Sequence, residues 1–173
     1  MPMTPADNQP LVIPPLPPPP PDYASRLPPV AEADELVSVG PDYMGREALL
    51  TPGAAAGWAA MRDAASAEGI ELILVSSFRS VARQTEILSA KLAKGMSLEA
   101  ALEYSAYPGF SEHHSGNAID IGTAGARHLE EEFEFTPAFA WLAGRAGGFG
   151  FSMTFPRNNR FAIAYEPWHW CFR

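Results

Sequence analysis

Apolar residues recur every three or four positions in three stretches of this chain, a spacing that predicts amphipathic helices. They are Trp58, Met61 and Ala65, then Val81, Thr85, Leu88 and Leu92, and later Phe139, Leu142 and Ala146. Thr51, Ser97 and Thr136 are suitable N-caps, and glycines close three of the segments. We therefore expect helices over residues 51–69, 81–95, 97–104 and 136–148, with the folded part of the chain beginning at the first of them.

Shorter apolar runs between these helices have the length of β-strands. Four are expected, over residues 71–76, 117–121, 149–154 and 161–164, with a turn at 156–159 and a last strand that carries His169. In the second of these runs, Asp120 faces away from its two isoleucine neighbours, Ile119 and Ile121. Helices first and a small, mostly antiparallel sheet later make the expected fold class α+β.

The first 35 residues differ in composition from the rest of the chain. Twelve of the 18 prolines precede Val30, including the unbroken run Pro17–Pro21. Proline lacks a backbone donor and fixes φ, so this segment favours polyproline II and cannot form a core of its own. We expect residues 1–35 to be an extended or disordered tail that buries little, and residues 36–173 to form one folded domain. A spacer, or a ligand for a proline-binding module, is the functional alternative for the tail.

Charge and composition exclude several classes of partner. A net charge of −8 argues against nucleic acid and anionic lipid, because both require a basic surface. No apolar run approaches the ~20 residues of a membrane span, and Met1–Pro21 does not have the pattern of a secretion signal. A single cysteine, Cys171, rules out an internal disulfide framework. We expect a monomer.

Candidate chemistry is concentrated in the stretch from Pro108 to Gly122, which reads PGFSEHHSGNAIDIG. His113 lies in a loop-like sequence seven residues before Asp120. A carboxylate on a short strand between isoleucines is costly unless something positive compensates it. A divalent metal is the natural compensator, and histidine is the commonest protein ligand for one.

A second group of chemical residues lies near the C-terminus, in YEPWHW. His169 is a further candidate ligand, and Glu166 is a carboxylate that could act as a general base beside the metal. In a regular strand these two side chains would face opposite ways, so the chain must kink at Pro167 if both are to reach one metal.

Three segments resemble the VanY-type D-alanyl-D-alanine carboxypeptidases, zinc peptidases of the fold group that includes lysostaphin and the hedgehog signalling domain. SEHHSGNAID resembles the family pattern S-x-H-x-x-G-x-x-x-D, and EPWHW resembles E-P-W-H. Ser76–Ser80 with Gln84 resembles the family's S-G-Y-R-S…Q segment. The likeness runs from about Leu50 to Phe172 in the family's order. It departs after W-H-W, where the family usually continues with arginine and tyrosine but this chain has Cys171 and Phe172.

The resemblance implies roles for individual residues. His113, Asp120 and His169 would bind Zn²⁺, Glu166 would be the catalytic base, and Arg79 would contact the substrate near the scissile carbonyl or the terminal carboxylate. Three further residues are expected to contact substrate: Ser111, Gln84 and Trp168. Trp168 also has a structural interpretation, because it shares a strand face with Trp170 and both could be core. We expect His114 to face away from the site, and Cys171, two residues after His169, to stay out of the ligand set.

The implied function is that of a zinc-dependent D-alanyl-D-alanine carboxypeptidase, with residues 36–173 as its catalytic domain. Its partner would be a peptidoglycan stem peptide, which implies an extracytoplasmic location. An L,D-carboxypeptidase acting on tetrapeptide stems and a peptidoglycan endopeptidase of the same fold group are enzymatic alternatives. A zinc-binding module without turnover is a further alternative, against which Glu166 argues, because a binding-only site needs no base beside its metal.

Overall fold

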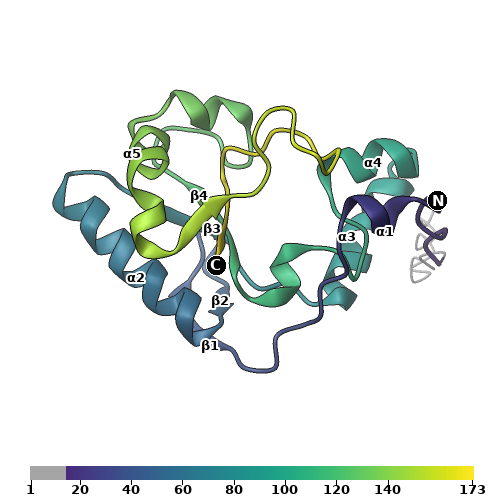
Figure 1. Ribbon diagram of the computed structural model, residues 1–173, viewed down its shortest axis with the longest axis horizontal. Coiled ribbons are helices and arrows are strands. Elements are labelled where there is room, and N and C mark those ends of the chain that lie inside the picture. The colour runs from purple at the N-terminus through teal and green to yellow at the C-terminus, as the bar shows by residue number, and fades with distance from the viewer. Residues whose placement is uncertain (1–14) are drawn as a thin grey trace, which may run out of the picture.

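The computed structural model describes residues 15–173 (Figure 1). Its helices are α1 (Tyr23–Arg26), α2 (Pro52–Ala67), α3 (Val81–Ala93), α4 (Leu98–Tyr104) and α5 (Pro137–Arg145). Short 3₁₀ turns are η1 (Glu112–Ser115), η2 (Glu131–Phe135) and η3 (Ala146–Phe149). The strands are β1 (Val37–Pro41), β2 (Glu47–Leu50), β3 (Ile73–Ser76), β4 (Ala118–Gly122), β5 (Phe151–Met153) and β6 (His169–Phe172).

The strands form two antiparallel sheets, which confirms the α+β prediction. One is the hairpin β1–β2, and the other has four strands in the order β3-β4-β6-β5. β4 lies inside the larger sheet, where Asp120 is opposite Ser76 on one side and His169 on the other. The strand expected to carry a buried carboxylate is therefore a central strand, paired along both edges.

The hydrophobic core consists of two clusters of buried side chains. The larger one lies between the sheet and the helices α2 and α5, and it includes Ile119, Ile121 and Trp170. Figure 1 shows α2 and α5 on one side of the sheet, with α1, α3 and α4 grouped at the opposite end. The second cluster joins these three helices to the loop before β6. Since side chains alternate along a strand, Asp120 and His169 project from the face that α2 and α5 leave uncovered.

The three helices predicted from apolar spacing and the fourth predicted from its cap at Ser97 are confirmed. The side-chain oxygens of Thr51, Ser97 and Thr136 each accept a hydrogen bond from a backbone N–H three residues further on. Among residues 15–173, no helix is long and apolar enough to cross a membrane.

Three strand expectations need correction. The folded part does not begin at α2, because the β1–β2 hairpin precedes it. The segment 161–164 is not a strand: Ala162 has φ 54°, and Asn159 bonds both the Phe161 N–H and the Ile163 carbonyl, folding the loop on itself. Ile163 is buried in the second cluster instead of pairing in a sheet. The strand expected over 149–154 is shorter, because η3 runs to Phe149.

The proline-rich segment is only partly as expected. Residues 1–14 lie outside the described residues, and the domain boundary near residue 35 stays a prediction. The expectation that the tail buries little is wrong for Tyr23 and Leu27, which are 2% and 3% exposed in the second cluster. Tyr23 Oη accepts the Tyr107 N–H at 2.9 Å, and Val30 N–H donates to the Gly109 carbonyl at 2.8 Å. The described part of the segment has no helix or strand other than α1, but it packs on the domain.

We therefore expect Leu27→Ala to lower stability by about 2–5 kcal/mol, because it leaves a cavity under a fully enclosed side chain. Urea unfolding followed by circular dichroism measures this. Met44→Ala is the matched control, since Met44 is 61% exposed and its truncation removes little buried surface. Equal, small effects of both substitutions would show that residues 15–35 do not pack on the domain in solution.

Candidate metal centre

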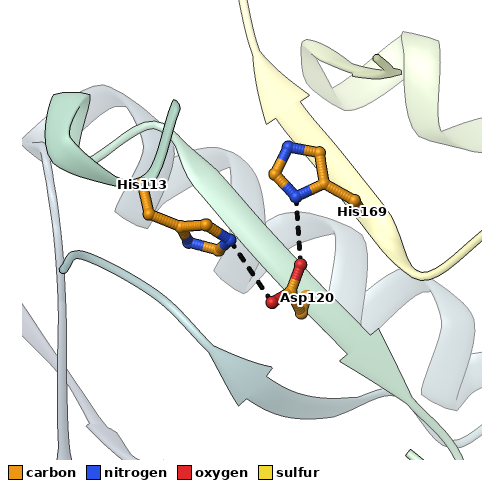
Figure 2. Close-up of side chains that lie close together, drawn as sticks. All are labelled: His113, Asp120 and His169. Atoms are coloured by element: carbon orange, nitrogen blue, oxygen red, sulfur yellow. Dashed lines mark hydrogen bonds and ion pairs between the residues drawn. The ribbon is translucent and has the colours of Figure 1, made fainter. Parts of the chain in front are cut away.

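Sheet register places two of the predicted ligands side by side. Asp120 on β4 is the direct partner of His169 on β6, so the two side chains share one face of the sheet (Figure 2). Asp120 Oδ1 lies 3.0 Å from His169 Nδ1. Both side chains are buried, and no charged residue could occupy these positions without a compensating partner.

His113 reaches the same point from the turn that leads into β4. It belongs to η1, where Ser111 Oγ accepts the His113 N–H at 3.3 Å and caps the turn. Gly116 then ends η1 in the left-handed conformation, with φ 67°, and a Cβ there would lie 2.8 Å from Leu36 Cδ2. Figure 2 shows the His113 ring turned toward Asp120, whose Oδ2 is 3.3 Å from His113 Nε2.

Outer hydrogen bonds fix which nitrogen of each imidazole faces Asp120. The Ser77 carbonyl accepts from His113 Nδ1 at 2.7 Å, and Glu112 Oε2 lies 3.0 Å from His169 Nε2. A carbonyl and an ionised carboxylate only accept, so these two ring nitrogens carry hydrogen. In neutral imidazoles, His113 Nε2 and His169 Nδ1 then direct lone pairs at the Asp120 carboxylate.

Lone pairs that face a carboxylate repel it unless a cation lies between them. Burial lowers the pKa of His113 despite its contact with Asp120, so a proton does not serve this purpose at His113 near neutral pH. Burial also opposes protonation of His169, but hydrogen bonds with Asp120 and Glu112 raise its pKa to about 10. Burial raises the pKa of Asp120, but the contacts with His113 and His169 outweigh it and hold that pKa well below its usual range.

The three side chains fit a zinc ion. One donor atom from each of His113, Asp120 and His169 lies within 4.8 Å of the others. Two imidazoles and a carboxylate are ligands that Zn²⁺ prefers, and three protein ligands leave one position open, as in catalytic zinc sites. A divalent cation at this point would bind the lone pair that His113 Nε2 directs at Asp120, and it would displace the proton that the raised pKa of His169 leaves on Nδ1.

Glu166 lies beside this group because the chain turns at Pro167. The His169 N–H donates to the Glu166 carbonyl at 3.1 Å, which closes a turn over Pro167 and Trp168. The kink that the sequence demanded at Pro167 is therefore present. Glu166 Oε2 lies 3.9 Å from His169 Nδ1. Burial raises the pKa of Glu166 to about 7, against the attraction of His169, Arg79 and Lys91.

Arg79 follows β3 and is tied to the turn that holds His113. Its backbone N–H donates to the His113 carbonyl at 3.1 Å, and its own carbonyl accepts from His114 Nδ1 at 2.6 Å. Its guanidinium donates to Gln84 Oε1 at 2.8 Å and to Ser76 Oγ at 3.1 Å. Gln84 is buried and lies behind Arg79, outside the residues that line the cavity.

One cavity of about 370 Å³ contains the three ligand candidates, Glu166 and Arg79. Ser111 and Trp168 also line it, so two of the three further residues expected at the substrate are at the cavity wall. Trp170, by contrast, is buried in the larger cluster and donates from its indole nitrogen to the Pro167 carbonyl. Trp168 also packs against the larger cluster, so it belongs to both the core and the cavity wall, whereas Trp170 lies in the core.

His114 and Cys171 stay out of the ligand group, as expected. His114 Nε2 accepts the Gly109 N–H at 3.1 Å, so both of its ring nitrogens are used by the backbone. Burial raises the pKa of Cys171 to about 12, which keeps it a thiol.

Sequence reasoning missed two residues at this site. Glu112, the variable residue of the S-x-H pattern, contacts His169, and Lys91 on α3 lines the cavity near Glu166. Lys91 Nζ donates to Ser105 Oγ at 2.5 Å, and burial lowers the pKa of Lys91. The spacing of α3 carried a weak signal for Lys91, because it lies one helical turn beyond Ile87, which also lines the cavity.

Three side chains that could hold a metal ion, beside a buried carboxylate in one cavity, form the arrangement that metal-dependent hydrolases use. The D-alanyl-D-alanine carboxypeptidase (VanY) family model matches residues 47–173. That match covers more than half of the sequence, and the chain belongs to this family.

Individual relatives agree with the family match. The Bacillus subtilis (strain 168) protein YodJ is 40% identical over 113 residues, which are 63% of this chain and 41% of YodJ. The structure of the LD-carboxypeptidase LdcB has a TM-score of 0.73 at 33% identity, covering 82% of this chain and 69% of LdcB. A variant of the vancomycin-resistance D,D-pentapeptidase VanY in complex with Zn(II) has a TM-score of 0.63 at 28% identity, covering 80% and 78%. The chain spans about two fifths of the length of the first curated relatives it matches.

Proposed function

We propose that this protein is a zinc-dependent D-alanyl-D-alanine carboxypeptidase that removes the terminal D-alanine from peptidoglycan stem peptides. The observation that carries the proposal is the convergence of His113, Asp120 and His169 with Glu166 and Arg79 in one cavity. Membership of the VanY family and the likeness to a Zn(II) complex of a D,D-pentapeptidase support the metal and the substrate class.

His113 Nε2, His169 Nδ1 and the Asp120 carboxylate would hold the metal. Bound Zn²⁺ supplies a Lewis acid and lowers the pKa of a coordinated water to about 7. Glu166 accepts the proton of the attacking water and delivers it to the leaving amine. Burial raises the pKa of Glu166 above its ordinary value, which makes this carboxylate a stronger base than an exposed glutamate.

The positive groups of the cavity suit a substrate that ends in a carboxylate. Arg79 and Lys91 both line the wall, together with the hydroxyl of Ser111. The sequence analysis assigned two tasks to Arg79, contact with the scissile carbonyl and contact with the terminal carboxylate. With Lys91 also at the wall, each task can have its own cation. One can stabilise the oxyanion of the scissile carbonyl while the other pairs with the terminal carboxylate. Gln84 holds the Arg79 guanidinium in place from behind.

An L,D-carboxypeptidase acting on tetrapeptide stems is the second candidate. The likeness to the LD-carboxypeptidase LdcB favours it, since that structure has the higher TM-score of the two reported above. Both activities need the same metal, base and carboxylate partner, so the difference lies in the cavity wall that meets the preceding residue. Mass spectrometry of products from defined pentapeptide and tetrapeptide stems, with and without a chelator, separates the two.

Blocking the substrate's terminal carboxylate tests the exopeptidase assignment. We expect C-terminal amidation of a pentapeptide stem to lower kcat/KM roughly 10- to 100-fold, because a hydrogen bond to a charged group is worth ~1.5–3 kcal/mol. The matched control is the free acid of the same peptide. Efficient cleavage of the amidated peptide at an internal bond would instead support the endopeptidase alternative.

The proposed substrate places the protein at the cell wall, on the extracytoplasmic side. All residues that the mechanism uses lie on one chain, so a monomer suffices for the reaction. The acidic surface gives no support to a nucleic-acid partner.

A further inference from the structure

Glu112 occupies an unassigned position next to the metal centre. It immediately precedes the ligand candidate His113, but its side chain turns toward the other histidine. Glu112 Oε2 lies 3.0 Å from His169 Nε2, on the side of the ring opposite Asp120. The Glu112 side chain is 15% exposed, so solvent competes little for this contact.

Two further residues hold the Glu112 carboxylate in this orientation. Thr154 Oγ1 donates to Glu112 Oε2 at 2.7 Å, and an Arg173 guanidinium nitrogen lies 2.6 Å from Glu112 Oε1. The same guanidinium nitrogen is 3.3 Å from Thr154 Oγ1, which closes a small network around the carboxylate. Both carboxylate oxygens are thus engaged, and rotation of Glu112 would break at least one contact.

Arg173 brings its guanidinium to Glu112 from the end of the chain, where the sequence departs from the family pattern. Position 171, where the family usually has arginine, holds Cys171 with its thiol buried. Residues 169, 171 and 173 alternate with the core-facing side chains, so Arg173 extends from the strand face that carries His169. A guanidinium therefore reaches Glu112 from two residues further along.

A carboxylate at Nε2 determines which nitrogen of His169 is free. An ionised carboxylate only accepts, so Nε2 carries a hydrogen whether or not His169 is charged, and Nδ1 is the nitrogen left to bind a metal beside Asp120. His113 has the opposite arrangement, because its Nδ1 donates to the Ser77 carbonyl and its Nε2 faces Asp120. Carboxylates or carbonyls behind metal-bound histidines fix the tautomer and raise ligand basicity, and their loss costs 10- to 100-fold in metal affinity.

We propose that Glu112 is a positioning residue that holds His169 in the tautomer that binds the metal through Nδ1, with Thr154 and Arg173 holding Glu112 in turn. The two histidines then bind through different nitrogens, Nε2 of His113 and Nδ1 of His169. This inference rests on the zinc site of the proposed function, and it assigns no substrate contact to Glu112.

The test measures zinc affinity of the full chain by competition with a chromophoric chelator. We expect Glu112→Ala to bind Zn²⁺ 10- to 100-fold more weakly than the parent protein. Glu112→Gln should retain most of the affinity, because its side-chain oxygen can still accept from Nε2. Glu132→Ala is the matched control: Glu132 pairs with Arg127 at the surface, far from any ligand candidate in sequence, and its loss should leave affinity unchanged.

Imidazole ¹H–¹⁵N spectra of the zinc-loaded protein provide a readout that a purely structural role would not move. They should show His169 bonded through Nδ1 with hydrogen on Nε2, and His113 the reverse. If Glu112→Ala does not fold, Thr154→Val and Arg173→Met test the same network without touching a ligand. Each should weaken zinc binding by a smaller factor.

The outcomes distinguish this inference from the proposed function. Parent affinity in folded Glu112→Ala, or metal bound through Nε2 of His169, would overturn the role of Glu112 and leave the enzyme assignment standing. If Glu112→Ala weakens zinc binding as expected but the parent protein releases no D-alanine, the role of Glu112 stands and the enzyme assignment is wrong. A parent protein that binds no zinc would remove both.

Discussion

Glu166→Gln should retain zinc and the native fold while lowering kcat by roughly 10²–10⁴-fold, the typical contribution of a general base. The amide has nearly the shape of the carboxylate, but it cannot accept a proton from the attacking water. The turn that places residue 166 depends on the backbone bond from the His169 N–H, which the substitution leaves intact. Single-turnover kinetics on a pentapeptide stem measures the loss of rate, and zinc content is measured on the same sample.

Glu131→Gln is the matched control for this substitution. Glu131 is an exposed glutamate on η2 that pairs with Arg157, so its change removes the same charge without reaching the cavity. Wild-type kcat in Glu166→Gln would show that Glu166 is not the base. A parent protein that binds zinc but releases no product would instead support the interpretation of the chain as a zinc-binding module without turnover.

The candidate metal centre could be predicted because its geometry follows from local rules. Asp120 lies between isoleucines, and strand alternation alone puts it on the face opposite theirs. Glu166 and His169 would face opposite ways in a regular strand, which predicted a kink at Pro167, and the structure has a turn there. What spacing could not supply is the register between β4 and β6, which pairs Asp120 directly with His169 across 49 residues of sequence.

Residues outside any periodic pattern escaped prediction. Glu112 reads as an ordinary polar loop residue, and only the arrival of β6 from the C-terminus gives it a partner in His169. Lys91 resembles a solvent-exposed helix residue in the sequence. Its side chain is long and flexible, so helical spacing alone does not predict where the ammonium group lies. In both cases the function of the side chain depends on segments far away in the sequence.

The packing of the N-terminal segment was not predicted, for a different reason. Its proline content disfavours regular structure, although the short helix α1 forms between the prolines, and the prediction extended the same argument to packing. An extended chain can still bury single side chains in a surface built by other elements. Tyr23 and Leu27 do so against α3 and α4, on the cluster that also holds Ile163. Ile163 itself was assigned to a strand. A short apolar run does not show whether its residues pair in a sheet or only bury side chains in a hydrophobic cluster.

Loss of the metal should accompany loss of any one of its three proposed ligands. We expect His113→Ala, Asp120→Ala and His169→Ala to contain strongly reduced zinc after dialysis, and to lose turnover with it. Each substitution leaves only two protein ligands, fewer than the three of catalytic zinc sites, and Asp120→Ala also removes the negative charge that offsets the cation. Metal analysis by mass spectrometry on folded, monodisperse protein measures the occupancy.

His114→Ala is the control that makes this series decisive. His114 is adjacent to His113 in sequence and fully buried, so its truncation disturbs the same turn. Its two ring nitrogens, however, contact only the Arg79 carbonyl and the Gly109 N–H. We therefore expect His114→Ala to lower the unfolding temperature but to bind zinc stoichiometrically in the folded fraction. Full occupancy in one of the other three variants would remove that residue from the ligand set, whereas metal loss in His114→Ala would mean that the integrity of η1, and not coordination by individual side chains, controls occupancy.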